Sequence, residues 1–284
     1  MAAIRAHHRD AAITLLTTAP YRAFLADCPY FDAISIDDRP AWWNLPGWRA
    51  LRRRLIEGRF HRVYDLQTSR RSSAYLRLFP RDRRPEWSGI ARGASHPHVN
   101  PGRDAMHTID RQAEQLRAAG IAAVPAPDLG WVADAPAPAL PDGRFVLLAP
   151  GGAVHRPQKR WPAERFAALA RALAARGLGA VVVGTADEAP LASAIRSGAP
   201  GTIDLTGRTD LADIVRIARR AAAAVGNDTG PMHLAAVAGC PSVVLFSAVS
   251  DPALCAPRGA AVVVLRAGDL AGLPVADVHA ARAW

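Results

Sequence analysis

Cysteine and lysine are scarce in this chain of 284 residues. The three cysteines, Cys28, Cys240 and Cys255, are odd in number and widely spaced, and no two of them form a CxxC pair. This usage is typical of a reducing compartment, and it argues against a disulfide scaffold and against a structural zinc site. Lysine occurs once, at position 159, so arginine supplies nearly all of the net charge of +10.

Long hydrophobic runs and internal repeats are also lacking, and we expect no secretory leader. No apolar run reaches membrane-spanning length, and residues 1–10 lack the apolar centre of a signal peptide. We therefore expect a cytoplasmic protein. The excess of positive charge predicts an acidic partner, which is a nucleic acid, an anionic membrane surface or a phosphorylated or carboxylated substrate. No RNP, zinc-finger or basic-zipper pattern supports specific nucleic-acid binding.

What the chain does contain is an alternation of short apolar runs with helical patterns. Strands spaced by helices are typical of βαβ units and a parallel sheet. In the first half the expected strands are 12–17, 33–36 and 62–66, and the expected helices are 20–26, 47–57, 70–79 and 106–119. In the second half the expected strands are 145–149, 180–184, 202–205, 221–225, 242–246 and 261–265, and the expected helices are 163–176, 188–197, 211–219 and 232–238.

Two domains are predicted, separated by a proline-rich linker. Residues 125–141 hold five prolines, so we expect an N-terminal domain over 1–135 and a C-terminal domain over 142–284. Uninterrupted apolar strands indicate helices on both faces of each sheet. The expected fold class is α/β, with two Rossmann-like domains facing each other across a cleft.

The N-terminal domain is expected to be incomplete. Residues 1–9 resemble the end of a helix that leads into the strand at 12–17, whereas a doubly wound domain starts with a strand and a ligand-binding loop. We therefore expect the first strand to be missing. Residues 83–107 are polar and rich in turn residues, which predicts a long loop.

Ligands of doubly wound sheets bind beyond the carboxyl ends of the strands, so the residues that follow each strand of the C-terminal domain are site candidates. Four such loops bring glycine, a cation, threonine and an acid to one edge, which is the inventory of a nucleotide diphosphate site. The candidates in the first three loops are Gly151, Lys159, Glu188 and Thr209.

The fourth loop is the motif Asn227-Asp-Thr-Gly-Pro-Met-His-Leu234, which ends an apolar run and opens a helix of small residues. Asp228 or Thr229 can cap that helix, and Pro231 suits its first turn. Thr229, Gly230 and His233 then lie at the positive end of the helix dipole, which predicts an anion pocket. The alternative is a capped core helix with a buried histidine.

The same motif resembles the signature of the ADP-heptose:lipopolysaccharide heptosyltransferase family, which comprises inverting enzymes of the GT-B fold. Pro150-Gly151, Lys159-Arg-Trp-Pro162 and Arg165-Phe166 are similar to a second family motif, and 205–211 resembles a third. The likeness extends over most of 145–252 and more loosely over 65–67 and 87–89.

The resemblance implies a role for each candidate. Lys159 would neutralise the donor phosphates, Glu188 would lie near the ribose and Thr209 beside the base. The donor diphosphate and sugar would occupy a pocket made by Asp228, Thr229, Gly230 and His233. The family needs no cofactor, and no DxD element that would hold a metal is present. The expected partners are a nucleotide-sugar donor, ADP-heptose by resemblance, and an acidic glycan or lipid-linked acceptor such as the lipopolysaccharide core.

The resemblance implies that the general base is an aspartate in a Gly-Asp pair after the first strand, and we expect this chain to lack both the strand and the pair. The general base therefore stays unassigned, and Lys159 is the one residue given a catalytic role, as stabiliser of the leaving phosphate. Two alternatives to the transferase follow. One is a non-catalytic or weakly active nucleotide-sugar-binding remnant, and the other is a GT-B nucleotide-sugar epimerase.

Three further groups of residues lie outside the donor motifs. Arg70 and Arg71 follow the 62–66 strand and are candidates for contacts with acceptor phosphate or carboxylate groups. Trp42, Trp43 and Trp48, with the arginines at 49 and 52–54, form either a contact with the inner membrane surface or a solvated helix face with tryptophans anchored in the core. The second interpretation is favoured. His96, His98 and His107 lack the helical i, i+4 pair typical of a metal site.

Overall fold

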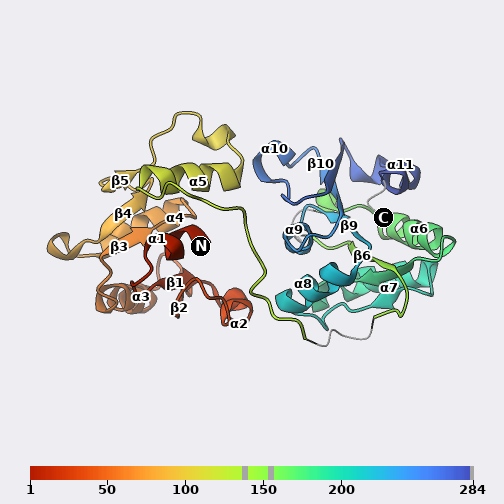
Figure 1. Cartoon of the computed structure of the whole chain (residues 1–284), viewed down its shortest axis with the longest axis horizontal. Coiled ribbons are helices and arrows are strands. Elements are labelled where there is room, and N and C mark those ends of the chain that lie inside the picture. Colours follow the sequence, from red (N-terminus) through yellow and green to blue (C-terminus); the bar gives the residue numbers. More distant parts are fainter. Residues whose placement is uncertain (136–139, 153–156, 282–284) are drawn as a thin grey trace. The chain divides into compact units, whose positions relative to one another are not determined.

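The computed structural model describes residues 1–135, 140–152 and 157–281. The chain divides into two compact units, Met1–Pro127 and Asp128–Trp284 (Figure 1). The proline-rich segment belongs to the second unit from Asp128 onward. The guanidinium group of Arg219 donates to the carbonyls of Val132 at 2.7 Å and Leu129 at 2.8 Å. These bonds hold residues 129–132 of the segment against the rest of that unit.

The second unit is built on a six-stranded parallel sheet with the strand order β11-β10-β9-β6-β7-β8. Its strands agree with the six predicted apolar runs to within two residues at either end. Four of them are continuous runs of apolar or small residues, as expected for a sheet buried on both faces. The strands are β6 (Phe145–Ala149), β7 (Gly179–Val182), β8 (Ile203–Asp204), β9 (Ala223–Asn227), β10 (Ser242–Ser247) and β11 (Val262–Ala267).

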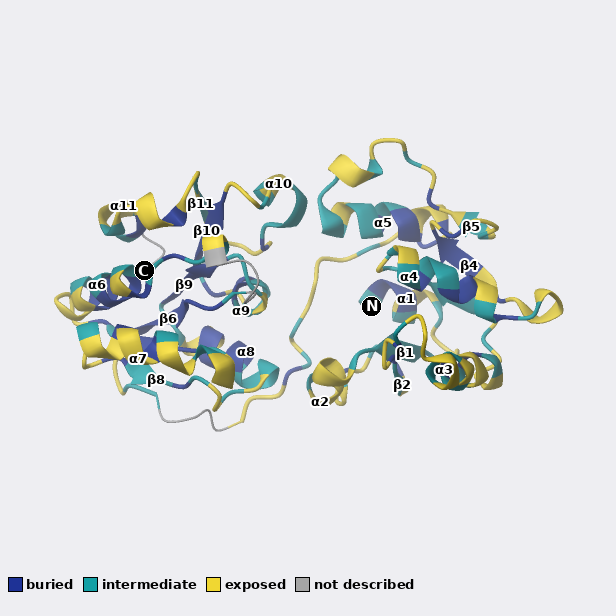
Figure 2. Ribbon diagram, turned by 180° about the vertical axis from the view of Figure 1, so that it is seen from behind, coloured by how far each residue is buried: buried dark blue, intermediate teal, exposed yellow. Residues whose placement is uncertain are grey.

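Helices cover both faces of this sheet, and Figures 1 and 2 show the buried strands between them. Because side chains alternate along a strand, Val146 and Leu148 pack with α6, α7 and α11, whereas Phe145 and Leu147 pack with α8 and α9. The elements are η5 (Pro157–Lys159), α6 (Ala163–Ala174), η6 (Ala186–Glu188), α7 (Ala189–Gly198), α8 (Leu211–Arg220), α9 (Gly230–Val237), α10 (Pro252–Cys255), η7 (Leu270–Gly272) and α11 (Val275–Ala280).

The first unit contains two small parallel sheets. One pairs β1 (Thr14–Thr17) with β2 (Ala33–Ile36), and the other has the order β3-β4-β5, with β3 (Arg62–Tyr64), β4 (Glu86–Gly89) and β5 (His96–Pro97). The helices are α1 (Ala2–His7), η1 (Ala19–Tyr21), α2 (Arg22–Leu25), α3 (Leu45–Glu57), α4 (Arg70–Ala74), η2 (Tyr75–Leu78), η3 (Arg81–Arg83), η4 (Arg103–Ala105) and α5 (Thr108–Ala118).

The core of the first unit is made by α3 and η2 on one side and by α1 and α5 on the other. Leu51 and Leu55 of α3 pack with Trp87 of β4. Ile4 of α1 packs with Leu116 of α5. These two apolar clusters are smaller than those of the second unit, because the strands of the first unit have only two to four residues.

The prediction of a loop over 83–107 is wrong, since β4 and β5 lie within it. β4 has no apolar run because its buried residues are Trp87, Ser88 and Gly89. Ser88 is fully buried, and its carbonyl accepts a hydrogen bond from Gln115 Nε2 at 3.2 Å. A strand of polar and small residues, whose hydrogen bonds are completed by the side chain of a helix, shows no hydrophobic periodicity. The sequence pattern therefore contains no sign of β4.

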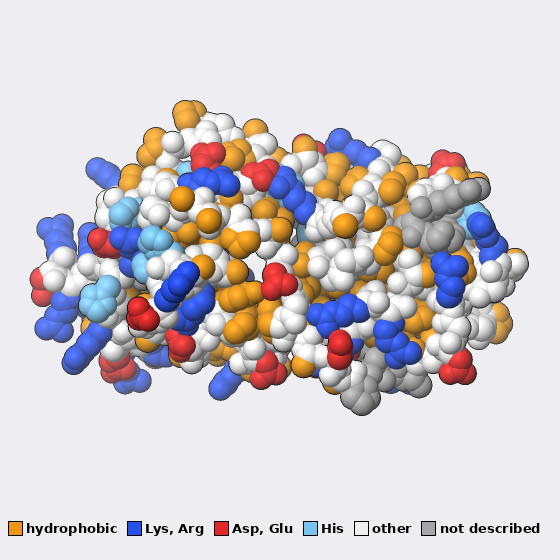
Figure 3. All heavy atoms as spheres, in the orientation of Figure 1, with side chains coloured by type: hydrophobic (Ala, Val, Ile, Leu, Met, Phe, Trp, Pro, Cys, Tyr) orange, Lys and Arg blue, Asp and Glu red, His pale blue; other side chains and the backbone are white. Residues whose placement is uncertain are grey.

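Arginine is spread over both units. Figure 3 shows basic side chains over one face of each unit, and they are most dense at the end of the first unit that carries α3. Within the described ranges, no helix has the length and apolar character needed to cross a bilayer.

Candidate functional site

The second unit has its topological switch point between β6 and β9. These strands are neighbours, with Ala149 opposite Gly226, but α6 and α9 pack on opposite faces of the sheet. The chain therefore diverges beyond their carboxyl ends, which is where doubly wound sheets bind ligands. The structure brings the loop that contains Gly151 and the turn over 227–230 to this point.

Asn227 joins three segments at the switch point. Its side chain is fully buried, and Oδ1 accepts the backbone N–H of Trp161 at 2.9 Å. Its Nδ2 donates to the carbonyls of Pro150 at 2.8 Å and Gly151 at 3.1 Å. Asn227 thus fixes the end of β9, the loop after β6 and the start of α6 against one another. It belongs to the recognised motif, but sequence analysis gave it no role; a polar residue at the end of an apolar run was the available signal.

Lys159, Asp228 and His233 converge at the same point. Lys159 Nζ lies 2.9 Å from Asp228 Oδ2, and His233 Nε2 lies 3.9 Å from Asp228 Oδ1. The side chains of Lys159 and Asp228 are 15% and 11% exposed, and that of His233 is 44% exposed. Asp228 therefore holds a nearly buried ammonium group in place, and the more accessible imidazole adds a hydrogen-bonding group beside it.

The first turn of α9 lies next to this pair. Thr229 is the N-cap residue, in an extended conformation, but its hydroxyl does not cap the helix and instead donates to the Asn227 carbonyl at 3.2 Å. The expectation of a side-chain cap is therefore wrong. A Cβ placed on Gly230 would meet no described heavy atom within 4 Å, so there is open space at the positive end of the helix.

Gly151 and Glu188 form a second part of the site. Glu188 Oε1 accepts the N–H of Gly152 at 2.9 Å, and Oε2 accepts the N–H of Thr185 at 2.8 Å. A Cβ on Gly151 would overlap this carboxylate, and one on Gly184 would lie 2.7 Å from Oε2. Both glycines are thus required by the position of Glu188. Each carboxylate oxygen retains a lone pair that can accept a bond from a ligand hydroxyl.

Buried hydroxyls at two further strand ends lack partners in the described structure. They are Thr206 and Thr209 in the loop after β8, and Ser247 at the end of β10. An unsatisfied buried hydroxyl costs about 1–3 kcal/mol, so these atoms are suited to ligand contacts. Thr209 was predicted as a base contact, whereas Thr206 and Ser247 were not singled out.

In the first unit the two predicted arginines, Arg70 and Arg71, have different surroundings. The Arg71 guanidinium donates to the Pro40 carbonyl at 3.1 and 3.2 Å and lies 5.4 Å from the centre of the Trp48 ring. It is therefore engaged by the scaffold. Arg70, the first residue of α4, is exposed.

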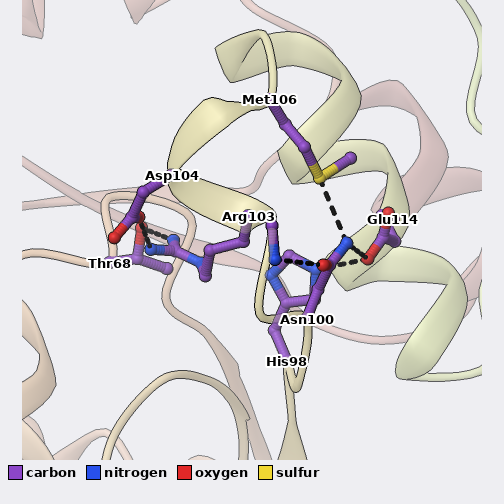
Figure 4. Close-up of polar contacts among 8 residues, drawn as sticks. Thr68, His98, Asn100, Arg103, Asp104, Met106 and Glu114 are labelled. Atoms are coloured by element: carbon purple, nitrogen blue, oxygen red, sulfur yellow. Dashed lines mark hydrogen bonds and ion pairs between the residues drawn. The ribbon is translucent and has the colours of Figure 1, made fainter.

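Arg103, which was not predicted as a site residue, lies beside the loop after β3 (Figure 4). Its side chain is 13% exposed and donates to Thr68 Oγ1 at 2.6 Å and to Asp104 at 2.9 Å. Thr68 has a φ of +47°, which a β-branched residue rarely adopts. The backbone there is held by a bond from the Thr68 N–H to Asp65 Oδ1 at 3.0 Å.

The three histidines have separate structural contacts. His98 Nε2 lies 3.0 Å from Glu114 Oε1, which also accepts from Asn100 Nδ2 at 2.6 Å (Figure 4). The hydrogen bonds from Asn100 and His98 lower the pKa of Glu114. His96 lies 3.6 Å from Glu86, and His107 caps α5 by accepting the N–H of Ile109. In the part of the chain that the structure describes, no group of three or more His, Cys, Asp or Glu side chains could hold a metal ion.

Comparison with known proteins identifies the family of the chain. The sequence model of glycosyltransferase family 9 (heptosyltransferase) matches residues 48–275. The lipooligosaccharide heptosyltransferase 2 of Haemophilus influenzae is 34% identical over 104 residues. That alignment covers 35% of this chain and 30% of the curated relative, so the matched region spans about a third of the relative's length.

Two solved structures resemble the whole chain. The ADP-heptose lps heptosyltransferase II of E. coli has a TM-score of 0.75 and 21% identity, over 99% of this chain and 91% of that one. A family 9 glycosyl transferase from Veillonella parvula has a TM-score of 0.81 and 20% identity, over 99% and 89%. At these identities the likeness establishes the fold, which is GT-B, with two Rossmann-like units in one chain.

Proposed function

Because the chain belongs to glycosyltransferase family 9, the heptosyltransferase family, we propose that it is an inverting glycosyltransferase. It transfers a heptose or a related sugar from a nucleotide-sugar donor, ADP-heptose, to the lipopolysaccharide core or another glycan acceptor. The observation that carries the proposal is the Lys159–Asp228 pair beside the first turn of α9, at the switch point of a Rossmann sheet.

In this proposal the second unit binds the donor. The ammonium group of Lys159, the N-terminal end of α9 at Thr229 and Gly230, and the His233 imidazole bind the diphosphate. A carboxylate repels a phosphate, so Asp228 acts by orienting Lys159 and by accepting hydroxyls of the sugar. Glu188 accepts ribose hydroxyls next to Gly151, and Thr209 contacts the base.

The chemistry is a direct displacement at the anomeric carbon. An acceptor hydroxyl attacks this carbon and loses its proton, while the bond from the carbon to the phosphate oxygen breaks and the nucleoside diphosphate leaves. Lys159 and the end of α9 stabilise the negative charge that develops on the leaving group, as preorganised electrostatic groups do. We assign no general base.

The acceptor is proposed to bind the first unit. Arg70 is the exposed cation at the start of α4, and it can bind acceptor phosphate or carboxylate groups directly. Arg71 supports the same region through Pro40 and Trp48. We further propose that the protein acts in the cytoplasm, at the inner surface of the membrane that carries a lipid-linked acceptor.

Two measurements test the proposal. Isothermal titration calorimetry with ADP and ADP-heptose measures donor binding, and a sugar-transfer assay with a lipopolysaccharide-core acceptor measures turnover. We expect binding of both ligands, with affinity reduced in Lys159→Ala and Asp228→Ala. Unchanged donor affinity in both variants would refute the site. Donor binding without transfer would identify a binding protein instead of an enzyme.

A further inference from the structure

The N-terminal end of α3 exposes an unusual group of large apolar side chains. Trp42 is 80% exposed, Trp43 67% and Leu45 60%, and Asn44 and Pro46 between and beyond them are also exposed. The prediction that these tryptophans are anchored in the core is wrong for Trp42 and Trp43. We call residues 42–46 the tryptophan tip. A contiguous exposed apolar group of this kind marks an interaction surface.

The tip is fixed to the first unit on both sides. Arg71 binds the carbonyl of Pro40, and Trp48 Nε1 donates to the carbonyl of Ala41 at 3.0 Å. Asn44 caps α3 by accepting the N–H of Gly47 at 2.9 Å. The rings of Trp42 and Trp43 are packed edge to face with centroids 5.3 Å apart. The tip therefore presents its apolar side chains on a rigid base, which reduces the entropy lost on docking.

A basic stripe continues from the tip along α3. Arg49, Arg52 and Arg53 follow Leu45 at positions i+4, i+7 and i+8, so all four lie on one side of the helix, and the three arginines are exposed. The opposite side, with Leu51 and Leu55, is buried in the core. Asp38 pairs with Arg54, and Glu57 at the far end lies 4.0 Å from Arg53. None of the ion pairs found in the described ranges uses Arg49 or Arg52.

We propose that the tryptophan tip and the basic stripe of Arg49, Arg52 and Arg53 form a docking surface for an anionic lipid bilayer. Tryptophan is favoured at the boundary between headgroups and hydrocarbon, and arginine binds lipid phosphates. The charge disfavours a second copy of this chain, because a symmetric contact would bring two basic stripes together. This inference deepens the proposed function, since it assigns the residues that would bring the enzyme to a lipid-linked acceptor.

Flotation of the purified full chain with lipid vesicles tests the docking surface directly. We expect binding to vesicles that contain phosphatidylglycerol and little binding to vesicles of phosphatidylcholine alone. Arg49→Ala/Arg52→Ala should weaken binding about 10- to 30-fold, at about a factor of five per arginine. Trp42→Ser/Trp43→Ser should weaken it at least about tenfold, because the apolar insertion is lost. All four side chains are exposed, so both variants should keep the melting temperature of the wild type.

Matched controls remove the same chemistry elsewhere. Val99 is 81% exposed, and Arg196 and Arg220 are exposed on α7 and α8. Val99→Ser and Arg196→Ala/Arg220→Ala should therefore bind vesicles like the wild type. Equal binding by the tip variants and the wild type would overturn the proposal. The proposal would also be overturned if the tip variants bound vesicles like the wild type but lost a dimer, or a complex with single-stranded RNA, that the wild type and the control variants form.

Transfer assays separate this inference from the proposed function. With a deacylated, water-soluble acceptor, the tip variants should be as active as the wild type. With the acceptor embedded in phosphatidylglycerol vesicles, they should lose about tenfold or more of the activity. If the wild type transfers no sugar at all, the proposed function fails, whereas the docking surface is still decided by flotation.

Discussion

Lys159 Nζ lies 2.9 Å from Asp228 Oδ2, although the two residues are 69 positions apart in the chain. One follows the loop after β6, and the other follows β9. Both side chains are almost buried, so each charge is neutralised mainly by the other. A donor diphosphate that enters this site meets an ammonium group already held in position.

Lys159→Ala should weaken donor binding about 10- to 100-fold, because it removes a charge-assisted bond worth about 1.5–3 kcal/mol. The double variant Lys159→Ala/Asp228→Asn should weaken binding by less than the sum of the single changes, with a coupling of about 0.5–3 kcal/mol. Calorimetry with ADP measures all three variants, and Arg196→Ala serves as the control. Strict additivity would show that the two side chains do not act as a pair in binding.

Gly151→Ala should reduce donor affinity by displacing Glu188, whose carboxylate occupies the space of the new Cβ. The change also breaks the bond from the Gly152 N–H to Glu188. In the Glu188→Ala background the same substitution meets no carboxylate, so the second change should cost much less. The contribution of the nucleoside, measured as the affinity difference between ADP and inorganic diphosphate, reports the effect. An equal penalty in both backgrounds would contradict the contact.

Asn227→Ala should destabilise the second unit by roughly 3 kcal/mol, because one buried N–H and two buried carbonyls lose their partner. Urea unfolding of the full chain measures the change. Asn44→Ala is a suitable comparison, since it removes an exposed helix cap worth about 1 kcal/mol. If Asn227→Ala costs no more than Asn44→Ala, the three hydrogen bonds at the switch point do not carry the stability assigned to them.

The pH dependence of stability should include a contribution from Glu114. Hydrogen bonds from Asn100 and His98 hold the pKa of its carboxyl below the usual value, so the folded state favours the charged form. The resulting stabilisation is present above the pKa of the unfolded chain and is lost as the pH falls through the lower pKa of the folded chain.

Thermal unfolding of the wild type and Glu114→Gln from pH 7 down to pH 3 tests this contribution. The wild type should be the more stable at pH 7, and the difference should shrink as the solution becomes acidic. Glu57→Gln, at an exposed position, should show little difference at either pH. A difference for Glu114→Gln that stays constant with pH would mean that its charge is not the cause.

The local sequence determined the type and order of most elements. Apolar runs such as 145–149 and 242–246 are typical of strands buried on both faces, and they form such strands as β6 and β10. The motif at 227–234 and the single lysine were predicted to meet beyond the carboxyl ends of the strands, and the structure places Lys159 beside Asp228 there; their role in donor binding stays a prediction. The strand β4 was hidden because its buried residues include serine and glycine.

Only the tertiary structure decided which of these groups meet and which face the solvent. The contacts of Lys159 with Asp228, of Glu188 with the loop at Gly151, and of Arg71 with Pro40 all join residues at least 31 positions apart. Local periodicity cannot encode them, because they depend on the order in which the strands pair. Trp42 and Trp48 show the same limit within one short segment. They are alike in sequence, yet the packing of α3 leaves the first exposed and turns the second against Tyr75.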